Sequence, residues 1–268
     1  MSPKVKIGLL VAVHIVAGLL LVWARANGLH TIRRMIAGFP IHTVGLFALV
    51  FADTGLIGFW GGLSTARFKW RLPAVYVAAM HLAAVLQQKF SAFIMIALTS
   101  VSILVILSRL RNSRKRLRLA HLANESSLKE GFQFTIRQLL VITAVVAVVL
   151  AIGRGVRMIT ATQWGDALAV VIYTPCFILV ELAMLWAALG IGSPTPRLAI
   201  VVPTSFAVGA VPAYYLEGVG HANWQRFVYW STVVGLQAII TAASLLVVRT
   251  CGLRLVSGTG GQGEPPGP

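Results

Sequence analysis

The sequence contains eight long apolar segments, and these limit the possible folds more than any other feature. They lie at roughly residues 7–24, 43–64, 72–87, 90–110, 135–153, 167–191, 198–217 and 227–248. Each is about 16–25 residues long, close to the roughly 20 residues that a helix needs to cross a hydrocarbon core. Lipid offers no hydrogen-bond partners, so the backbone groups of such segments must bond to one another, which favours helices. The sequence therefore predicts an all-α membrane protein with about eight transmembrane helices.

The composition agrees with this prediction. Of the 268 residues, 57% are hydrophobic and 11% are charged, and the mean hydropathy is +0.84. A soluble domain of this size would not expose so much apolar surface. The polar segments are too short to fold a catalytic domain. The chain also carries no Walker loop, G-x-S-x-G, H-E-x-x-H, EF-hand or dinucleotide-binding pattern. We therefore assign no catalytic residue, no cofactor and no metal site.

Two short motifs occur twice along the chain. Trp60–Leu63 reads Trp-Gly-Gly-Leu and is followed by Arg71-Leu72, and Trp186–Leu189 reads Trp-Ala-Ala-Leu and is followed by Arg197-Leu198. The offset from Trp60 to Trp186 is 126 residues. A second shared triplet lies upstream in each half, as Arg34-Met35-Ile36 and Arg157-Met158-Ile159. Both motifs fall at matching places among the apolar segments, which predicts an internally repeated architecture.

The repeat divides the chain into two membrane units of four helices each. We expect the first repeat over 1–110, a basic cytoplasmic linker over 111–134, the second repeat over 135–250 and a disordered tail over 251–268. An even number of crossings gives both repeats the same orientation, so a pseudo-two-fold axis along the membrane normal should relate them. The boundary between the third and fourth helices is the least defined, because only Gln87-Gln88-Lys89 separate them.

The basic residues are distributed unequally between the two sides of this predicted topology. The net charge is +16, from 23 basic and 7 acidic residues. With the N-terminus inside, the outer segments hold only Arg25, Arg33, Arg34, Lys89, Arg154, Arg157 and Arg226. The cytoplasmic segments hold all the other basic residues. The asymmetry follows the positive-inside rule and predicts a bacterial cytoplasmic (inner) membrane protein with both termini in the cytoplasm.

Several basic and aromatic side chains are predicted to contact lipid. The interfacial anchors are Trp60, Arg71, Arg137, Trp186 and Arg197. A cluster at the end of the fourth span could bind anionic headgroups, or could only retain its loop inside; it consists of Arg109, Arg111, Arg114, Lys115, Arg116 and Arg118. No aromatic residue interleaves this cluster, which argues against nucleic acid as a partner. Membrane lipids are thus the expected partners, and no protein partner is indicated.

The first forty residues allow two interpretations. Lys4 and Lys6, the apolar run 7–22 and Ala24-Arg25-Ala26 together resemble a cleavable signal peptide. Cleavage would remove the first helix from one repeat only, so the repeat favours an uncleaved transmembrane helix. After this segment, Ile32, Met35, Ile36 and Phe39 follow helical spacing, which predicts a short interfacial helix over 31–39.

Four ionisable residues fall near the centres of predicted spans: His14, Asp53, His81 and Glu181. An acid at the bilayer centre costs about 2.5–3.5 kcal/mol on insertion scales, so these side chains should face the bundle interior and find partners. They could form a midplane polar site that shares protons or binds a cation. Alternatively they make only interhelical hydrogen bonds, worth about 0.6 kcal/mol on average. At the 126-residue offset Glu181 aligns with Gly55, so at most one such site is expected.

The junction between the predicted repeats carries a resemblance to other proteins. It reads Phe132-Gln133-Phe134-Thr135-Ile136-Arg137-Gln138-Leu139-Leu140. This resembles the F-x-F-[ST]-[LI]-R-x-L-L segment at the mouth of membrane helices in many uncharacterised multi-pass membrane proteins of planctomycete bacteria. The helix ends Phe59–Leu63 and Leu185–Leu189 look similar to multi-pass members of that group. The resemblance implies a lineage and carries over no activity, because the segment occurs in proteins of different build.

Three functions remain open from the sequence. The first is a structural or accessory role without enzymatic activity, which is our leading expectation. The second is a small-solute or ion transporter that uses the midplane polar site. The third is an intramembrane metal-dependent enzyme, which no residue pattern supports positively.

The predicted topology can be tested with reporter fusions. Alkaline phosphatase, which is active only outside the cytoplasm, should be inactive when fused after Ala120 or Val256, and a fluorescent reporter there should be bright. The reason is that the surrounding basic residues hold both positions inside. A phosphatase fusion after Arg33 is the matched outside control and should be active. Phosphatase activity at either of the first two positions would contradict the topology.

Overall fold

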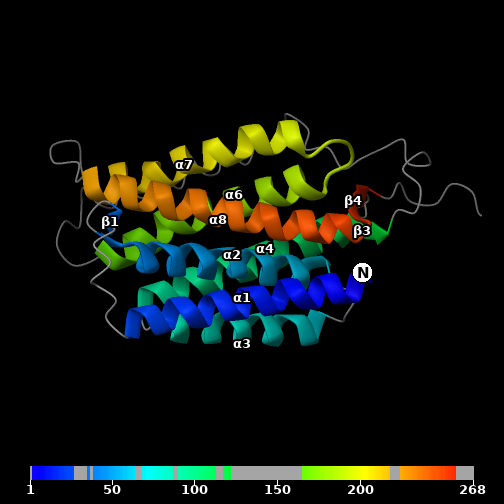
Figure 1. Ribbon diagram of the computed structural model, residues 1–268, viewed down its shortest axis with the longest axis horizontal. Coiled ribbons are helices and arrows are strands. Elements are labelled where there is room, and N and C mark those ends of the chain that lie inside the picture. Colours follow the sequence, from blue (N-terminus) through cyan, green and yellow to red (C-terminus); the bar gives the residue numbers. More distant parts are fainter. Residues whose placement is uncertain are drawn as a thin grey trace, which may run out of the picture.

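Apart from two short two-stranded sheets, the part of the chain that the structure describes is built from α-helices (Figure 1). The computed structural model describes residues 2–26, 35–36, 39–63, 68–86, 90–112, 117–121, 165–217 and 224–257. The helices in this part of the chain are α1 (Pro3–Ala26), α2 (Ile41–Leu63), α3 (Phe68–Leu86), α4 (Phe90–Asn112), α6 (Gly165–Leu189), α7 (Thr195–Glu217) and α8 (Trp224–Thr250). The expected all-α class is therefore confirmed.

Each of these helices coincides with one predicted span. The third and fourth spans are separate helices, α3 and α4, and the predicted span 135–153 lies outside the described residues. The segments long and apolar enough to cross a membrane are Val5–Ala24, Ile41–Leu63, Val170–Leu189 and Trp224–Thr250, and α4 adds the shorter apolar stretch Ile94–Leu110. These apolar helices indicate a membrane protein.

The helices pack as two groups of three with one helix outside them. Within the first group α2, α3 and α4 contact one another, and within the second α6, α7 and α8 do the same. Between the groups, α2 packs against α8 and α4 packs against α6. The remaining helix, α1, lies against α2 and α8 (Figure 1). The centre of the bundle is therefore formed by α2, α4, α6 and α8.

Side-chain contacts define which helix ends lie together. Lys6 Nζ, near the start of α1, donates to Thr250 O at the end of α8 over 3.3 Å. Arg249 of α8 donates to carbonyl groups at the end of α6. We call this the basic end of the bundle; its described basic residues are Lys6, Lys69, Arg71, Arg109, Arg197, Arg249 and Arg254. At the opposite end α2, α6 and α8 begin (Figure 1).

A two-stranded sheet lies at each end of the bundle (Figure 1). At the basic end β3 (Leu117–His121) pairs antiparallel with β4 (Leu253–Ser257). At the opposite end β1 (Met35–Ile36) pairs antiparallel with β2 (Phe39–Pro40). Two expectations are wrong here. The strand β4 lies in the tail expected to be disordered, and β1 and β2 replace the helix expected over 31–39.

Local sequence explains both differences. Pro40 disfavours helical geometry at the residue before it, so Phe39 is extended and the predicted helix cannot pass through it. In β4, Leu253, Leu255 and Ser257 alternate with Arg254 and Val256, the period of a strand with one buried face. Leu255 is buried, whereas the Gly- and Pro-rich part of the tail begins only after Ser257.

Aromatic side chains and glycines shape the interior contacts. The rings of Phe51 on α2 and Phe177 on α6 stack with centroids 4.1 Å apart. Three glycines on α2 bring α3 and α4 close, because a Cβ would clash there. It would lie 2.9 Å from Ile103 Cβ at Gly58, 2.7 Å from a methyl group of Val75 at Gly61, and 2.5 Å from Leu107 Cβ at Gly62. Such close approach through small residues is the usual way membrane helices pack.

The duplicated Arg-Leu motif has a structural role in both groups. Arg71, at the start of α3, is buried, and its Nη1 donates to Gly61 O at 2.6 Å and to Gly62 O at 3.3 Å. It thereby satisfies carbonyl groups that the end of α2 leaves without intrahelical partners. Arg197, at the start of α7, donates to Ile191 O, and its guanidinium carbon lies 4.9 Å from the Trp186 ring centre.

We predict that Arg71→Ala destabilises the protein by about 1–3 kcal/mol, because buried carbonyl groups at the end of α2 lose their donor. Unfolding of the detergent-solubilised protein measures the effect. Lys69→Ala is the control, since Lys69 is exposed and lies two residues away; its effect should stay within about 0.5 kcal/mol. Equal stability of the two variants would show that the carbonyl contacts contribute nothing.

Candidate functional site: a polar cluster between α1, α2, α6 and α8

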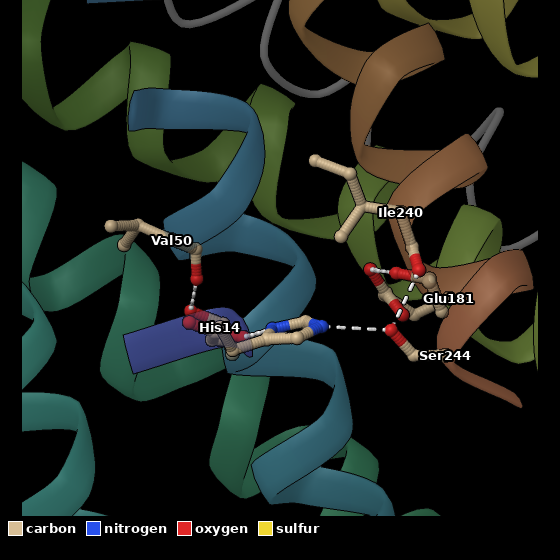
Figure 2. Close-up of polar contacts among 8 residues, drawn as sticks. His14, Val50, Glu181, Ile240 and Ser244 are labelled. Carbon is tan, nitrogen blue, oxygen red and sulfur yellow. Dashed lines mark hydrogen bonds and ion pairs between the residues drawn. The ribbon is translucent and has the colours of Figure 1, made fainter. Parts of the chain in front are cut away.

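The structure brings His14 of α1 into contact with both α2 and α8 (Figure 2). His14 Nδ1 lies 2.5 Å from Asp53 Oδ1, and His14 Nε2 lies 2.9 Å from Ser244 Oγ. The side chains of His14 and Asp53 are 14% and 22% exposed. The apolar segment Val5–Ala24 has no share buried within the bundle, so α1 is an outer helix. The hydrogen bonds of His14, near the middle of α1, attach this helix to the centre of the bundle.

The hydrogen-bond partners of His14 indicate where the protons lie. Ser244 Oγ donates to Ile240 O, one turn earlier on α8, over 2.8 Å (Figure 2). That oxygen then accepts from His14 Nε2. One further proton lies between His14 Nδ1 and Asp53 Oδ1, which are 2.5 Å apart. The two side chains together therefore carry no net charge and form a polar pair inside the apolar spans.

A second polar group surrounds Glu181 of α6. Glu181 Oε1 accepts from Gln237 Nε2 at 2.7 Å and from Thr241 Oγ1 at 3.1 Å. All three side chains are fully buried. Gln237, Thr241 and Ser244 are spaced i, i+4 and i+7, so they share one face of α8. One stripe of α8 therefore contacts both polar groups, and Asp53 is close enough to Glu181 for their charges to interact.

Gly55 of α2 makes the position of Glu181 possible. A Cβ added at Gly55 would lie 2.1 Å from Glu181 Oε2 and 2.2 Å from its carboxyl carbon. The carboxyl group thus occupies the space that a side chain at Gly55 would fill. Any larger residue at position 55 would displace Glu181 from the contact between α2 and α6.

The structure joins three of the four residues predicted for the midplane polar site. Asp53 is in direct contact with His14, and Glu181 is close enough to Asp53 for their charges to interact. His81 is part of α3, but its side chain lies outside the described part of the structure. Sequence reasoning missed the residues that α8 contributes. Their signal was present, because Gln237, Thr241 and Ser244 form a polar stripe with helical spacing in the eighth span.

The residues predicted to contact lipid lie mainly at the basic end. Trp60 is exposed there, Trp186 is partly buried beside Arg197, and Arg71 is buried. Arg109 is exposed on α4. Arg111 belongs to α4 and Arg118 to β3, but their side chains are not among those described. The positions 114–116 and 137 lie outside the described residues, so lipid binding by this set stays a prediction.

The side chains of this cluster are suited to binding and transferring protons. Imidazole, carboxyl and hydroxyl groups in contact can pass or share a proton across several helices. The order Asp53, His14, Ser244 is also that of a hydrolase triad, but Ser244 is 2% exposed and its hydroxyl points along α8. No group of three or more His, Cys, Asp or Glu side chains within the described ranges could hold a metal ion.

Comparisons with known proteins do not extend this picture: no protein-family model matches the chain, and no match was found among curated proteins or solved structures.

We predict that His14 and Asp53 are energetically coupled. A double-mutant cycle with His14→Ala and Asp53→Ala should give a coupling energy of about 1 kcal/mol or more, above the roughly 0.6 kcal/mol average for membrane hydrogen bonds. Reversible unfolding in mixed micelles is the measurement. Thr204 is exposed on α7, so a cycle of Asp53→Ala with Thr204→Ala is the control and should be additive. A His14–Asp53 coupling energy below about 0.3 kcal/mol would contradict the pairing.

Proposed function

We propose that the protein is a multi-pass transporter of a bacterial inner membrane, in which protons move through the polar cluster. The cluster contains the His14–Asp53 pair, Ser244 and Glu181. The observation that carries the proposal is the 2.5 Å contact of His14 with Asp53, beside the fully buried Glu181. Ionisable side chains inside a membrane bundle are costly, and their usual use is in ion pathways and proton relays.

The location of the cluster supports transport. Its side chains come from α1 and α2 on one side and from α6 and α8 on the other, so the cluster lies where the two helix groups meet. In transporters built from repeats, substrate and coupling-ion sites lie near the bilayer midplane at the interface between the repeats. Asp53 and His14 each lie near the middle of their own helix, which agrees with such a depth.

The proposal includes eight crossings with both termini in the cytoplasm. In its support, α4 ends at the basic end while α6 begins at the opposite end (Figure 1); the apolar segment 135–153 is long enough to supply a crossing between them. Exposed tryptophans lie at both ends: Trp23 and Trp224 at one, Trp60 and Trp70 at the other. This is the distribution of aromatic belts, and the basic end would face the cytoplasm.

The proposal also includes a duplication. Buried residues recur along α2 and α6 at the 126-residue offset, as Val44 and Val170, Leu46 and Ile172, Phe47 and Tyr173, Phe51 and Phe177, and Phe59 and Leu185. They recur along α4 and α8 at an offset of 138, as Met95 and Val233, Thr99 and Gln237, Ile103 and Thr241, and Leu107 and Leu245. Helix contacts are likewise matched, since α2 with α8 corresponds to α6 with α4. Such agreement favours two parallel repeats.

A structural or accessory role is the competing proposal. The observation in its favour is that the same contacts of His14 hold the outer helix α1 against α2 and α8. In that case the cluster fixes helix positions and moves nothing. The planctomycete-type lineage, proposed from the segment 132–140, is compatible with either role.

Proton flux distinguishes the two roles. We predict that the purified protein in liposomes conducts protons when a potassium diffusion potential is applied, measured with an entrapped pH-sensitive dye. Asp53→Asn keeps the shape but removes the charge that pairs with His14, so the initial rate should fall by about tenfold, or about 1.4 kcal/mol on the barrier.

Two controls complete this assay. Thr204→Ala alters an exposed residue of α7 and should conduct like the wild type. Empty liposomes give the background leak. Flux at background level in the wild type, or equal flux in wild type and Asp53→Asn, would leave the structural role as the remaining one.

A further inference from the structure

Two buried oxygen atoms of the cluster have no hydrogen-bond partner among the described residues. They are Glu181 Oε2 and Gln237 Oε1. They belong to side chains already in contact, because Gln237 Nε2 donates to the other carboxyl oxygen of Glu181 at 2.7 Å. A carboxylate oxygen and an amide oxygen are both acceptors, so neither can satisfy the other as it stands. Buried acceptors without donors are rare in folded proteins and need an explanation.

One proton removes both deficiencies. A carboxylic acid has an O–H donor that a carboxylate lacks. If Glu181 Oε2 carries a proton, it can donate to Gln237 Oε1, while Gln237 Nε2 still donates to Glu181 Oε1. The acid and the amide then form a cyclic pair with two hydrogen bonds. Protonation also removes a negative charge that is fully buried and has no cationic contact in the described part of the chain, which would otherwise cost several kcal/mol.

We propose that Glu181 is a proton-binding site, whose carboxyl group carries a proton that it shares with the amide oxygen of Gln237 in the resting protein. If the proposed transport function holds, on which this step rests, this proton is the one that the transport cycle loads and releases. The His14–Asp53 pair is then its neighbour in the same polar cluster.

The surroundings of Glu181 favour a proton over a metal ion. Oε2 lies against the backbone of α2, in the space that a Cβ at Gly55 would occupy, which leaves little room for a cation and its further ligands. A proton needs no such room. The groups that α8 presents are the uncharged Gln237 and Thr241, and α4 presents the hydroxyl groups of Thr99 and Ser100 at the bundle centre.

The charged groups near Glu181 also favour a proton on its carboxyl group. Asp53 of α2 is the acid close enough to interact with Glu181, and its negative charge disfavours a second one. His14 of α1 contacts Asp53 and Ser244 directly, and no contact between His14 and Glu181 is among the described interactions. The His14–Asp53 pair shares one proton and carries no net charge, so a proton on Glu181 leaves the whole cluster without net charge.

Infrared spectroscopy tests the proton directly. We expect the purified protein at pH 7 to show a protonated-carboxyl C=O band that shifts in D2O, and Glu181→Gln should abolish it. Asp53→Asn is the matched control and should retain the band, because the band belongs to the Glu181 carboxyl group. Gln237→Leu removes the amide partner and should move the band to higher frequency, which identifies Gln237 as the group that shares the proton.

Absence of the band from the wild type would overturn the proposal, as would a band that Glu181→Gln leaves unchanged. If Glu181→Gln fails to fold, the shift in Gln237→Leu decides, since an ionised Glu181 gives no such band to move. The spectrum is independent of transport, so the two proposals can fail separately. If the infrared band of Glu181 is present but the liposomes show no proton flux, only the transport proposal is overturned. If the liposomes show flux that depends on Asp53 but the band is absent, only the proposed proton site is overturned.

Discussion

The free energy of placing two carboxyl groups inside an apolar bundle governs how the central helices meet. Asp53 and Glu181 lie within the apolar spans of α2 and α6, where water cannot solvate them. Each is stabilised in a different way. Asp53 contacts the imidazole of His14, and Glu181 accepts hydrogen bonds from Gln237 and Thr241. Because these partners belong to α1 and α8, Asp53 has its partner only when α1 packs on α2, and Glu181 only when α8 packs on α6.

The helix α8 has a special position in this arrangement. Gln237 and Thr241 reach the acid of α6, and Ser244, one turn further, reaches the histidine that binds the acid of α2. A movement of α8 along its axis would change the partners of both acids together. This connection is a physical route by which protonation of one acid could affect the other, as proton-coupled transport requires.

The helical class and the positions of the described helices could be predicted from the sequence, whereas the site could be predicted only in part. Helix positions follow from apolar length, and even α3 and α4 were separated across Gln87-Gln88-Lys89. The prediction failed at Phe39 and at Leu253–Ser257. At Phe39 the following proline disfavours a helix, and in Leu253–Ser257 the alternating side chains form a strand although the tail as a whole is rich in glycine and proline. His14, Asp53 and Glu181 were identified because charge is rare inside membranes. Their partners on α8 were missed, because uncharged polar residues in membrane helices are common and only packing selects among them.

A two-fold relation between the two proposed repeats would explain why the cluster occurs once. Residues on such an axis meet their own equivalents, and Phe51 stacks on Phe177 at the 126-residue offset. The next equivalent pair along the same face is Gly55 and Glu181, whose contact leaves space for a single side chain. A carboxyl group in each repeat would place two acids in one volume, where steric overlap and like-charge repulsion both oppose it. Duplication would therefore preserve the packing of these helices while requiring the acid to be retained in only one repeat.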